Sequence, residues 1–299
     1  GAFTQFVEPN GQRQVAVAQD GSYVVTWVSQ NQDAAGGTGV YARRFDANGG
    51  ALTPEIQVNQ FTAGDQRSPA VAADVNGNFV VAWQSAAQDG SGNGVYARRF
   101  DAAGVALGAE FQVNTTTANA QQWPGIGMNA SGQFVIGWSS FGQDGSDYGA
   151  YVRVYDATGT ALSGEIQVAT ATAGAQLFDA VALDAAGNFV VVGEGVNIDG
   201  ALQGIFGQRF DAAGNKLGGQ FTVNGNTAGA QVSASIAMDS SGRFVVSWTD
   251  LNVNAGDVVA RRFDSTGTAL GAQFAVNTTT ANVQRYSSVA ADAAGNFTG

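Results

Sequence analysis

Acidic side chains at a regular spacing are the first residues in this sequence that could do chemistry. Four aspartates each follow a repeated strand end by six residues, and a fifth lies close to the third of them: Asp33, Asp89, Asp144, Asp199 and Asp147. Carboxylate oxygens together with loop carbonyls bind calcium, which takes about six to eight oxygen ligands. The competing interpretation is that an Asp-Gly pair makes a tight turn and the aspartate caps its own loop. Because no Asp-x-Asp-x-Asp series occurs, the turn is favoured, and Ca²⁺ is kept as a candidate cofactor.

Aromatic residues recur at the start of a predicted first strand. They are Trp123, Phe178 and Tyr286, and two other copies have Ser68 and Ser233 at this position. Aromatic rings beside amide and acidic loops suit stacking on sugar rings, since ligand sites combine apolar rings with a few polar groups. The alternative is that the rings close off the top of the fold. We therefore name the three aromatics as candidate ligand-binding residues.

Groups for acid–base or nucleophilic catalysis are scarce. The chain has no histidine and no cysteine, which excludes imidazole catalysis, thiol nucleophiles, disulfides and zinc–thiolate sites. Glu55, Glu110 and Glu165 repeat one position and so favour a structural role, whereas Glu194 has no counterpart. A glycosidase needs a pair of carboxylates, and no acid–base set interrupts the repeat. The sequence therefore predicts no catalytic residues and a protein that is not an enzyme.

Composition and charge exclude further classes of function. With 13 basic and 24 acidic residues among 299, the net charge is −11, so the chain lacks the basic surface that nucleic acid requires. No stretch approaches the roughly 18 apolar residues of a membrane-spanning helix, so no membrane span is expected. The 42 glycines are typical of short strands joined by glycine turns.

The elements that position these residues come from a repeat. An aromatic-Val-Val/Ile-x-Trp tract recurs, and its leading aromatics are 55 or 56 residues apart once a degenerate copy ending in Gly193 is included. The tryptophans that end the other copies, predicted to be core, are Trp27, Trp83, Trp138 and Trp248. A fixed period of this size indicates an array of identical supersecondary units.

Residues 66–114 show how one unit is built. Predicted strands lie at 69–73, 79–83, 95–100 and 107–114, separated by Asp-x-x-Gly turns and one long polar loop. The inner strands are apolar on both faces and must be covered on both sides, while the last strand alternates as a half-exposed strand does. This pattern predicts an all-β fold, a β-propeller of four-stranded antiparallel blades. In that topology the long loops and the links between blades share one face, where a ligand site is expected.

The period also sets the predicted boundaries of a single domain, residues 1–299. The blades are predicted at about 12–59, 66–114, 121–169, 176–224 and 231–277, with a final blade from 284–299 completed by an N-terminal strand at 2–8. Six blades are favoured, with five or seven as alternatives. The last repeat stops inside its second strand, so we expect a segment of a longer protein.

The unit resembles known bacterial repeats. Residues 181–191, Val-Ala-Leu-Asp-Ala-Ala-Gly-Asn-Phe-Val-Val, look like the strand–turn–strand of NHL and SBBP propeller repeats, and the longer unit 95–114 is similar to tandem repeats of very large secreted or cell-surface bacterial proteins. The resemblance implies an extracellular or cell-surface bacterial protein. We expect a non-enzymatic structural, adhesive or binding module whose partners are glycans, surface proteins or further copies in a longer repeat chain. A carbohydrate-binding lectin propeller is the alternative, and a glycan-active enzyme is the third.

Overall fold

The fold is described from a computed structural model, which covers residues 4–6, 13–33, 36–252, 256–279, 281–292 and 295–298. Every regular element in these ranges is a β-strand, so the predicted all-β class is confirmed. Within the same ranges there is no helix of the length and hydropathy needed to cross a bilayer.

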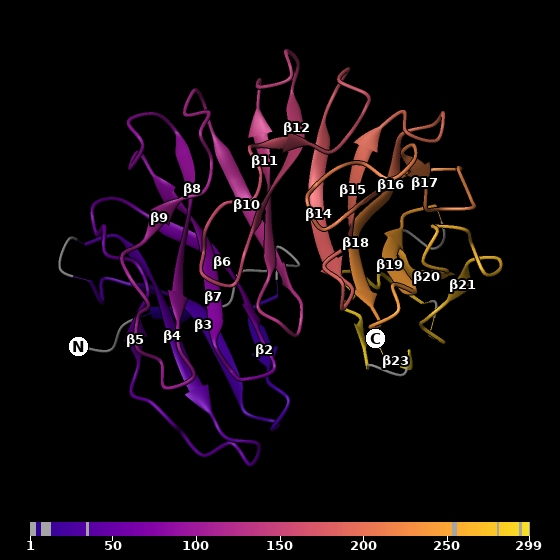
Figure 1. Ribbon diagram of the computed structural model, residues 1–299. Helices are drawn as coiled ribbons and strands as arrows, with labels where there is room; N and C mark the ends of the chain where they lie inside the picture. The colour runs from indigo at the N-terminus through magenta and orange to yellow at the C-terminus, as the bar shows by residue number, and fades with distance from the viewer. Residues whose placement is uncertain are drawn as a thin grey trace.

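Four blades contain the four strands that the repeat predicts. The second blade is β6 (Gln66–Ala73), β7 (Phe79–Ala86), β8 (Asn93–Phe100) and β9 (Phe111–Gln112), paired antiparallel in that order. The third is β10 (Gln121–Met128), β11 (Phe134–Phe141), β12 (Tyr148–Tyr155) and β13 (Ile166–Gln167), and the fourth is β14 (Gln176–Leu183), β15 (Phe189–Val196), β16 (Gln203–Phe210) and β17 (Phe221–Thr222). The fifth is β18 (Gln231–Met238), β19 (Phe244–Asp250), β20 (Asp257–Phe263) and β21 (Phe274–Ala275). Figure 1 shows these sheets fanned around a common centre, with the first strand of each blade innermost, which is the arrangement of a β-propeller.

The first blade is assembled from two separate inner segments. Both β1 (Thr4–Phe6) and β2 (Val15–Val17) pair with β3 (Tyr23–Gln30), which continues through β4 (Thr38–Phe45) to β5 (Ile56–Gln57). β2 reaches only Tyr23–Val25, and β1 pairs with the rest of the edge of β3, at Val28–Gln30. The N-terminal strand predicted to complete the final blade therefore lies in the first blade instead, because it supplies hydrogen-bond partners to backbone groups that β2 is too short to reach.

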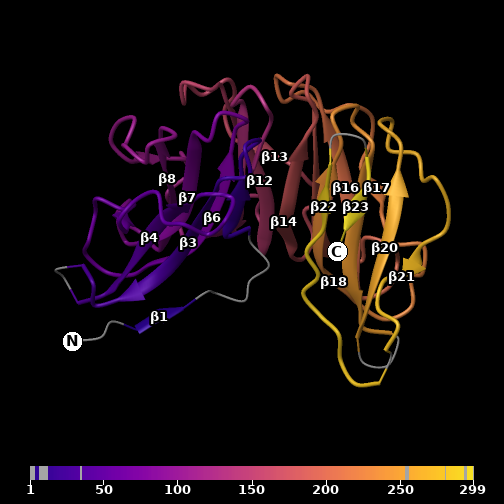
Figure 2. The same cartoon turned by 90° about the horizontal axis from the view of Figure 1, so that it is seen from below.

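The last sheet has two strands, β22 (Ala290–Ala291) and β23 (Phe297–Thr298). It lies beside β18 of the fifth blade, as Figure 2 shows, and Val289 packs there with Ala237, Val245 and Ala260. The described residues thus form four complete blades, a first blade with a divided inner strand and a partial sixth, which agrees with the predicted count.

The core lies between neighbouring blades, as expected of strands that are apolar on both faces. Trp83, Trp138 and Trp248 are fully buried, while Trp27 in the first blade is only half-buried. Paired aromatics stack across adjacent strands, with 4.9 Å between the ring centres of Phe79 and Phe100. The predicted core role of the three interior tryptophans is therefore confirmed.

Candidate functional site

The repeated glutamates tie one blade to the next. Glu110 on the second blade accepts hydrogen bonds from the backbone N–H groups of Gln60 and Phe61, which link the first blade to the second, and from the Gln88 amide. The equivalent Glu165 does the same one blade later, with Thr116 N at 3.0 Å and Gln143 Nε2 at 2.7 Å. Glutamines occupy the position in the next two blades and accept the same kind of bond: Gln220 and Gln273. These side chains are architectural, as their spacing predicts.

Three of the five candidate metal-binding aspartates cap their own loops. Asp89 accepts from Ser91 N at 3.2 Å, Asp144 from Ser146 N at 3.1 Å and Asp199 from Ala201 N at 3.1 Å. Asp33 is buried and Asp147 is exposed. The described part of the chain contains no cluster of three or more acidic residues arranged to hold a metal ion. The hydrogen bonds match the turn interpretation, and calcium binding stays a prediction.

The aspartates also lie against glycines of the third strand in each blade. A Cβ atom on Gly94 would come within 2.7 Å of Asp89, and one on Gly149 within 2.9 Å of Asp144. Asn114 adds a bond to Asp89 at 3.3 Å. Each aspartate therefore fills a space that the glycine leaves open, which is a packing reason for its regular spacing.

The three candidate aromatics have different environments. Tyr286 is 59% exposed, Trp123 is half-buried, and Phe178 is only 3% exposed. The Phe178 ring lies directly over Gly137 of the preceding blade, where an added Cβ would fall 2.0 Å from the ring. Phe178 is therefore a core residue that cannot stack on a bound sugar, which contradicts its predicted role.

Trp123 belongs to a cluster that the sequence did not reveal. Tyr148 lies between Trp123 and Phe141, with ring centres 5.2 Å and 5.1 Å away, and Phe141 is 41% exposed. The three residues stand at the start of β10, the end of β11 and the start of β12, so they share the face of the long loops. We call Trp123, Phe141 and Tyr148 the aromatic patch.

Two carboxyl groups meet in the fourth blade, at Asp179 and Glu194. Glu194 Oε2 accepts a hydrogen bond from Ser233 N at 2.6 Å, and Asp179 Oδ2 accepts one from Ala234 N at 3.1 Å. Consecutive backbone amides of β18 thus hold the two side chains next to each other, and both residues are half-buried. We call Asp179 and Glu194 the carboxyl pair.

A bulge that the four complete blades share positions one member of this pair. In the second blade the register of β6 shifts between Arg67 and Ala70, opposite Trp83. In the fourth blade the same shift lies between Phe178 and Ala180, so Asp179 is the extra residue, and Gly193 stands where the second blade has Trp83. Bulges redirect a side chain at the edge of a site, and this one places a carboxyl beside Glu194.

The environment changes the acidity of both groups. Burial, followed by the negative charge of Glu194, raises the pKa of Asp179 well above its ordinary value, and burial also raises the pKa of Glu194. Two neighbouring carboxyls titrate as a coupled pair, because the charge on one raises the cost of ionising the other. The pair therefore combines a carboxyl that keeps its proton to higher pH than an exposed aspartate does with a second carboxyl beside it.

The sequence carried only part of this signal. Glu194 stood out because it has no counterpart among the glutamates, but Asp179 was not singled out. Its equivalents in the second, third and fifth blades are uncharged: Pro69, Pro124 and Ala234. A position-by-position comparison of the copies would have marked Asp179, although only the structure shows that it meets Glu194.

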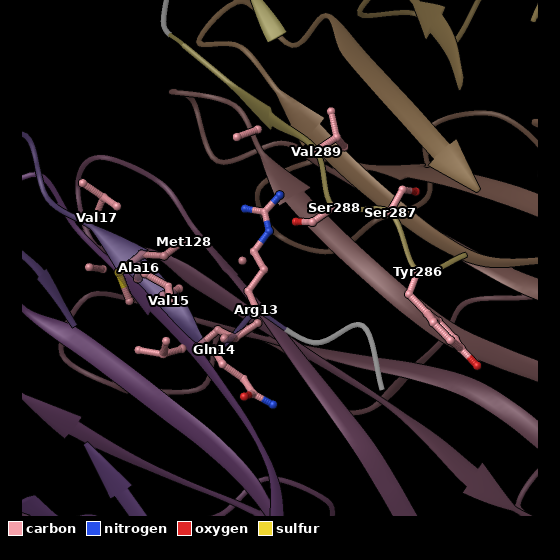
Figure 3. A pocket seen from close by; sticks show the side chains of 16 residues that line it. Arg13, Gln14, Val15, Ala16, Val17, Met128, Tyr286, Ser287, Ser288 and Val289 are labelled. Carbon is pink, nitrogen blue, oxygen red and sulfur yellow. The ribbon is translucent and has the colours of Figure 1, made fainter. Parts of the chain in front are cut away.

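A cavity of about 640 Å³ lies at the centre of the described structure, between β2 and residues 286–290. Figure 3 shows the Arg13 side chain extending across it toward Ser288 and Val289. Arg13 donates a hydrogen bond to the Ile236 carbonyl of the fifth blade. The cavity is open to solvent, and Arg13 is an exposed residue on its lining.

Comparisons with known proteins rest on structure, since no family model and no curated protein matches the sequence. A protein of unknown function from Dyadobacter fermentans aligns with a TM-score of 0.59 at 10% identity, over 93% of this chain and 85% of that one. The NanB sialidase from Streptococcus pneumoniae gives 0.59 at 7% identity, over 97% and 65% of the two chains. A thermostable family-43 glycoside hydrolase gives 0.50 at 10% identity, over 93% and 96%.

These likenesses establish the β-propeller fold, although the chain spans less than two thirds of the NanB sialidase. They support the propeller part of the resemblance noted in the sequence. They contradict the prediction that the chain is not an enzyme, because the folds it matches include a sialidase and a glycoside hydrolase. No acid–base pair interrupts the repeat in the sequence, but the structure brings the carboxyl groups of Asp179 and Glu194 together.

Proposed function

We propose that this protein is a glycan-active propeller that hydrolyses glycosidic bonds at the carboxyl pair. The observation that carries the proposal is the placement of Asp179 and Glu194 on consecutive amides, with the pKa of Asp179 raised by burial and by Glu194. Glycoside hydrolysis requires a carboxylic acid that keeps its proton until it reaches the leaving group. The glycan-active enzymes among the structures of the same fold are in keeping with this assignment.

The chemistry assigned to the pair is a proton transfer to the leaving oxygen. Asp179 donates its proton to the glycosidic oxygen while the bond from that oxygen to the anomeric carbon breaks, so the leaving sugar departs as an alcohol. Water then supplies a hydroxyl group to the anomeric carbon and a proton to the Asp179 carboxylate, which restores the acid. Glu194 acts as a positioning residue whose charge keeps Asp179 protonated.

The repeat supplies conservative variants for the test. Glu194→Gln installs the residue found at the same position in the second blade, where Gln84 accepts a hydrogen bond from Trp123 N at 3.1 Å. The fold should therefore tolerate the change. Asp179→Asn keeps the shape of the side chain and removes the acid, and Asp211→Asn, at a half-buried turn aspartate of the same blade, serves as the control.

The measurement is the release of reducing sugar from a panel of plant and bacterial polysaccharides and from aryl glycosides. Asp179→Asn is expected to lose activity by about 100-fold or more, the range for a general acid. Glu194→Gln should shift the alkaline limb of the pH–activity profile to lower pH, because it removes a charge that raises the pKa of Asp179. Asp211→Asn should match the wild type. Absence of hydrolysis across the panel, or full activity in Asp179→Asn, would reject the proposal.

We further propose that the protein acts outside the bacterial cell, where polymeric glycans and surface proteins are its partners and longer repeat chains can self-associate. The absence of cysteine, the single lysine and the net charge of −11 are in keeping with an extracellular protein. Fractionation of cells that express the full-length natural chain tests this, with recovery in the cytosol as the contrary result.

A further inference from the structure

The aromatic patch is confined to one blade of the repeat. The positions of Trp123, Phe141 and Tyr148 in the third blade correspond in the other complete blades to the following residues: Ser68, Ala86 and Asn93 in the second, Phe178, Val196 and Gln203 in the fourth, and Ser233, Leu251 and Gly256 in the fifth. Those three blades form the same four-stranded sheet. The blade therefore does not need three aromatic residues at these positions in order to fold.

The patch also differs from the core aromatics of its own blade. Phe134 and Tyr155 are buried and stack in parallel at 4.9 Å. The patch rings are tilted or edge-on to each other, and Phe141 is 41% exposed. Apolar surface that is exposed, clustered and rimmed by polar groups marks a binding site more often than a structural element.

Trp123 is held in a backbone conformation that favours small residues. Its φ angle is +55°, and the equivalent residues with the same geometry are Ser68, Ser233 and the exposed Tyr286. A bulky side chain in the left-handed region is strained. Other copies have a serine in this conformation, so the repeat does not require a tryptophan here. The bulky ring therefore indicates a role for the tryptophan side chain itself.

Side-chain amides surround the rings. Gln122 Nε2 donates to the Tyr148 hydroxyl, and Asn93 Nδ2 donates to Gln122 Oε1 at 3.3 Å. Gln84 accepts from Trp123 N at 3.1 Å. Rings with amides at their edge match the two kinds of surface on a sugar, whose C–H face is apolar and whose rim carries hydroxyl groups.

The charges at the patch select among sugars. Exposed Asp147 precedes Tyr148, and burial together with the Asp147 charge raises the pKa of the Tyr148 hydroxyl, which stays neutral. A negative neighbour repels uronates and other anionic sugars. A neutral pyranose meets no such penalty.

We propose that the aromatic patch binds neutral pyranose rings of a polysaccharide, as a site one blade away from the carboxyl pair. Trp123 and Phe141 present the apolar surface, and the Gln122–Tyr148 pair contacts the hydroxyl groups. The patch and the pair stand at the same ends of neighbouring inner strands, β10 and β14. The binding role does not depend on hydrolysis.

The repeat again supplies the variants. Trp123→Ser and Tyr148→Asn install the residues of the second blade, so they should leave the sheet intact. The control is Leu202→Ser, which removes an apolar side chain that is 61% exposed on the same face, in the loop before β16 of the fourth blade. All variants are made in the Asp179→Asn background, so that hydrolysis does not consume the ligand, and melting curves check the fold.

Binding is measured by affinity electrophoresis in glucan, mannan, galactan and xylan, with polygalacturonate as the anionic comparison, and by tryptophan fluorescence. Retardation by at least one neutral polysaccharide is expected, with a loss of about tenfold or more in Trp123→Ser, the equivalent of a single stacking contact. Leu202→Ser should bind as its parent does. Equal binding by Trp123→Ser, preference for polygalacturonate, or no retardation by any neutral polysaccharide would overturn the proposal. Binding without hydrolysis in the wild type would instead reject only the role of the carboxyl pair.

Discussion

The second and fourth blades share their strand order and their turns, and among their sequence differences three lie next to one another in the fold. Asp74 and Asp184 accept the same bonds from Asn78 and Asn188, respectively, in the turn between the first two strands. The three differences place Asp179, Gly193 and Glu194 where the second blade has Pro69, Trp83 and Gln84. A residue that both blades share can be explained by the needs of the sheet. The three residues that differ cannot, because the second blade forms the same sheet without them. The second blade is thus an internal control for the fourth.

The largest effect is expected where the second blade has its tryptophan. Trp83 is fully buried between blades, so Trp83→Ala should lower the free energy of unfolding by about 3 to 5 kcal/mol. Urea denaturation measures the change. A cost below about 1 kcal/mol would show that a blade does not need a tryptophan at this position. The presence of Gly193 in the fourth blade would then not mark a functional site.

A smaller loss is expected when the fourth blade is changed toward the second. A Cβ on Gly193 would lie 2.1 Å from the Leu177 carbonyl oxygen and 2.5 Å from the Phe206 ring. Gly193→Ala should therefore destabilise the protein by about 1 to 3 kcal/mol, the usual cost of overpacking. Gly164→Ala is the matched control, because no atom lies within 4 Å of its added Cβ. If the two variants unfold alike, the close packing around Gly193 does not constrain the site.

The carboxyl pair predicts a pH dependence with a definite sign. The pKa of Asp179 is higher in the folded than in the unfolded chain, so the folded state binds more protons between the two pKa values. Stability should then fall as the pH rises through that window, by at most about 1.4 kcal/mol per pH unit for one proton. Melting curves from pH 4 to 8 should show a flatter dependence in Asp179→Asn. An unchanged slope would mean that Asp179 is not the group that titrates.

Calcium offers the smallest effect, because both blades carry the same capped aspartate. Asp89 and Asp199 accept bonds from their own turns and from Asn114 and Asn224, respectively. Millimolar calcium is therefore expected to leave the melting temperature within about a degree, since only a specific site raises stability by mass action. A shift of several degrees that disappears in Asp89→Asn would restore the calcium interpretation.

The sequence was most informative where one unit recurs. Strand order, turns and interior tryptophans followed from the repeat, because each copy reports the same local constraints. The pairing of β1 with β3 could not be predicted from the repeat. The free edge of a sheet can pair with any strand of suitable length, and contacts distant in sequence decide which strand binds there. Phe178 was misassigned because its strand position is shared with Trp123, while Gly137 on the neighbouring blade opens a space for its ring. The carboxyl pair was missed because its members come from two strands.

The glutamate and glutamine contacts between blades have a consequence for how such a chain can grow. Each later repeat carries the side chain that fastens the backbone link before it, as Glu110 does for Gln60 and Phe61. A duplicated unit therefore brings its own attachment to its predecessor, and no new interface has to arise. In a chain of nearest-neighbour units, this lets gene duplication lengthen the array one blade at a time, while single copies such as the third and fourth blades diverge toward new roles.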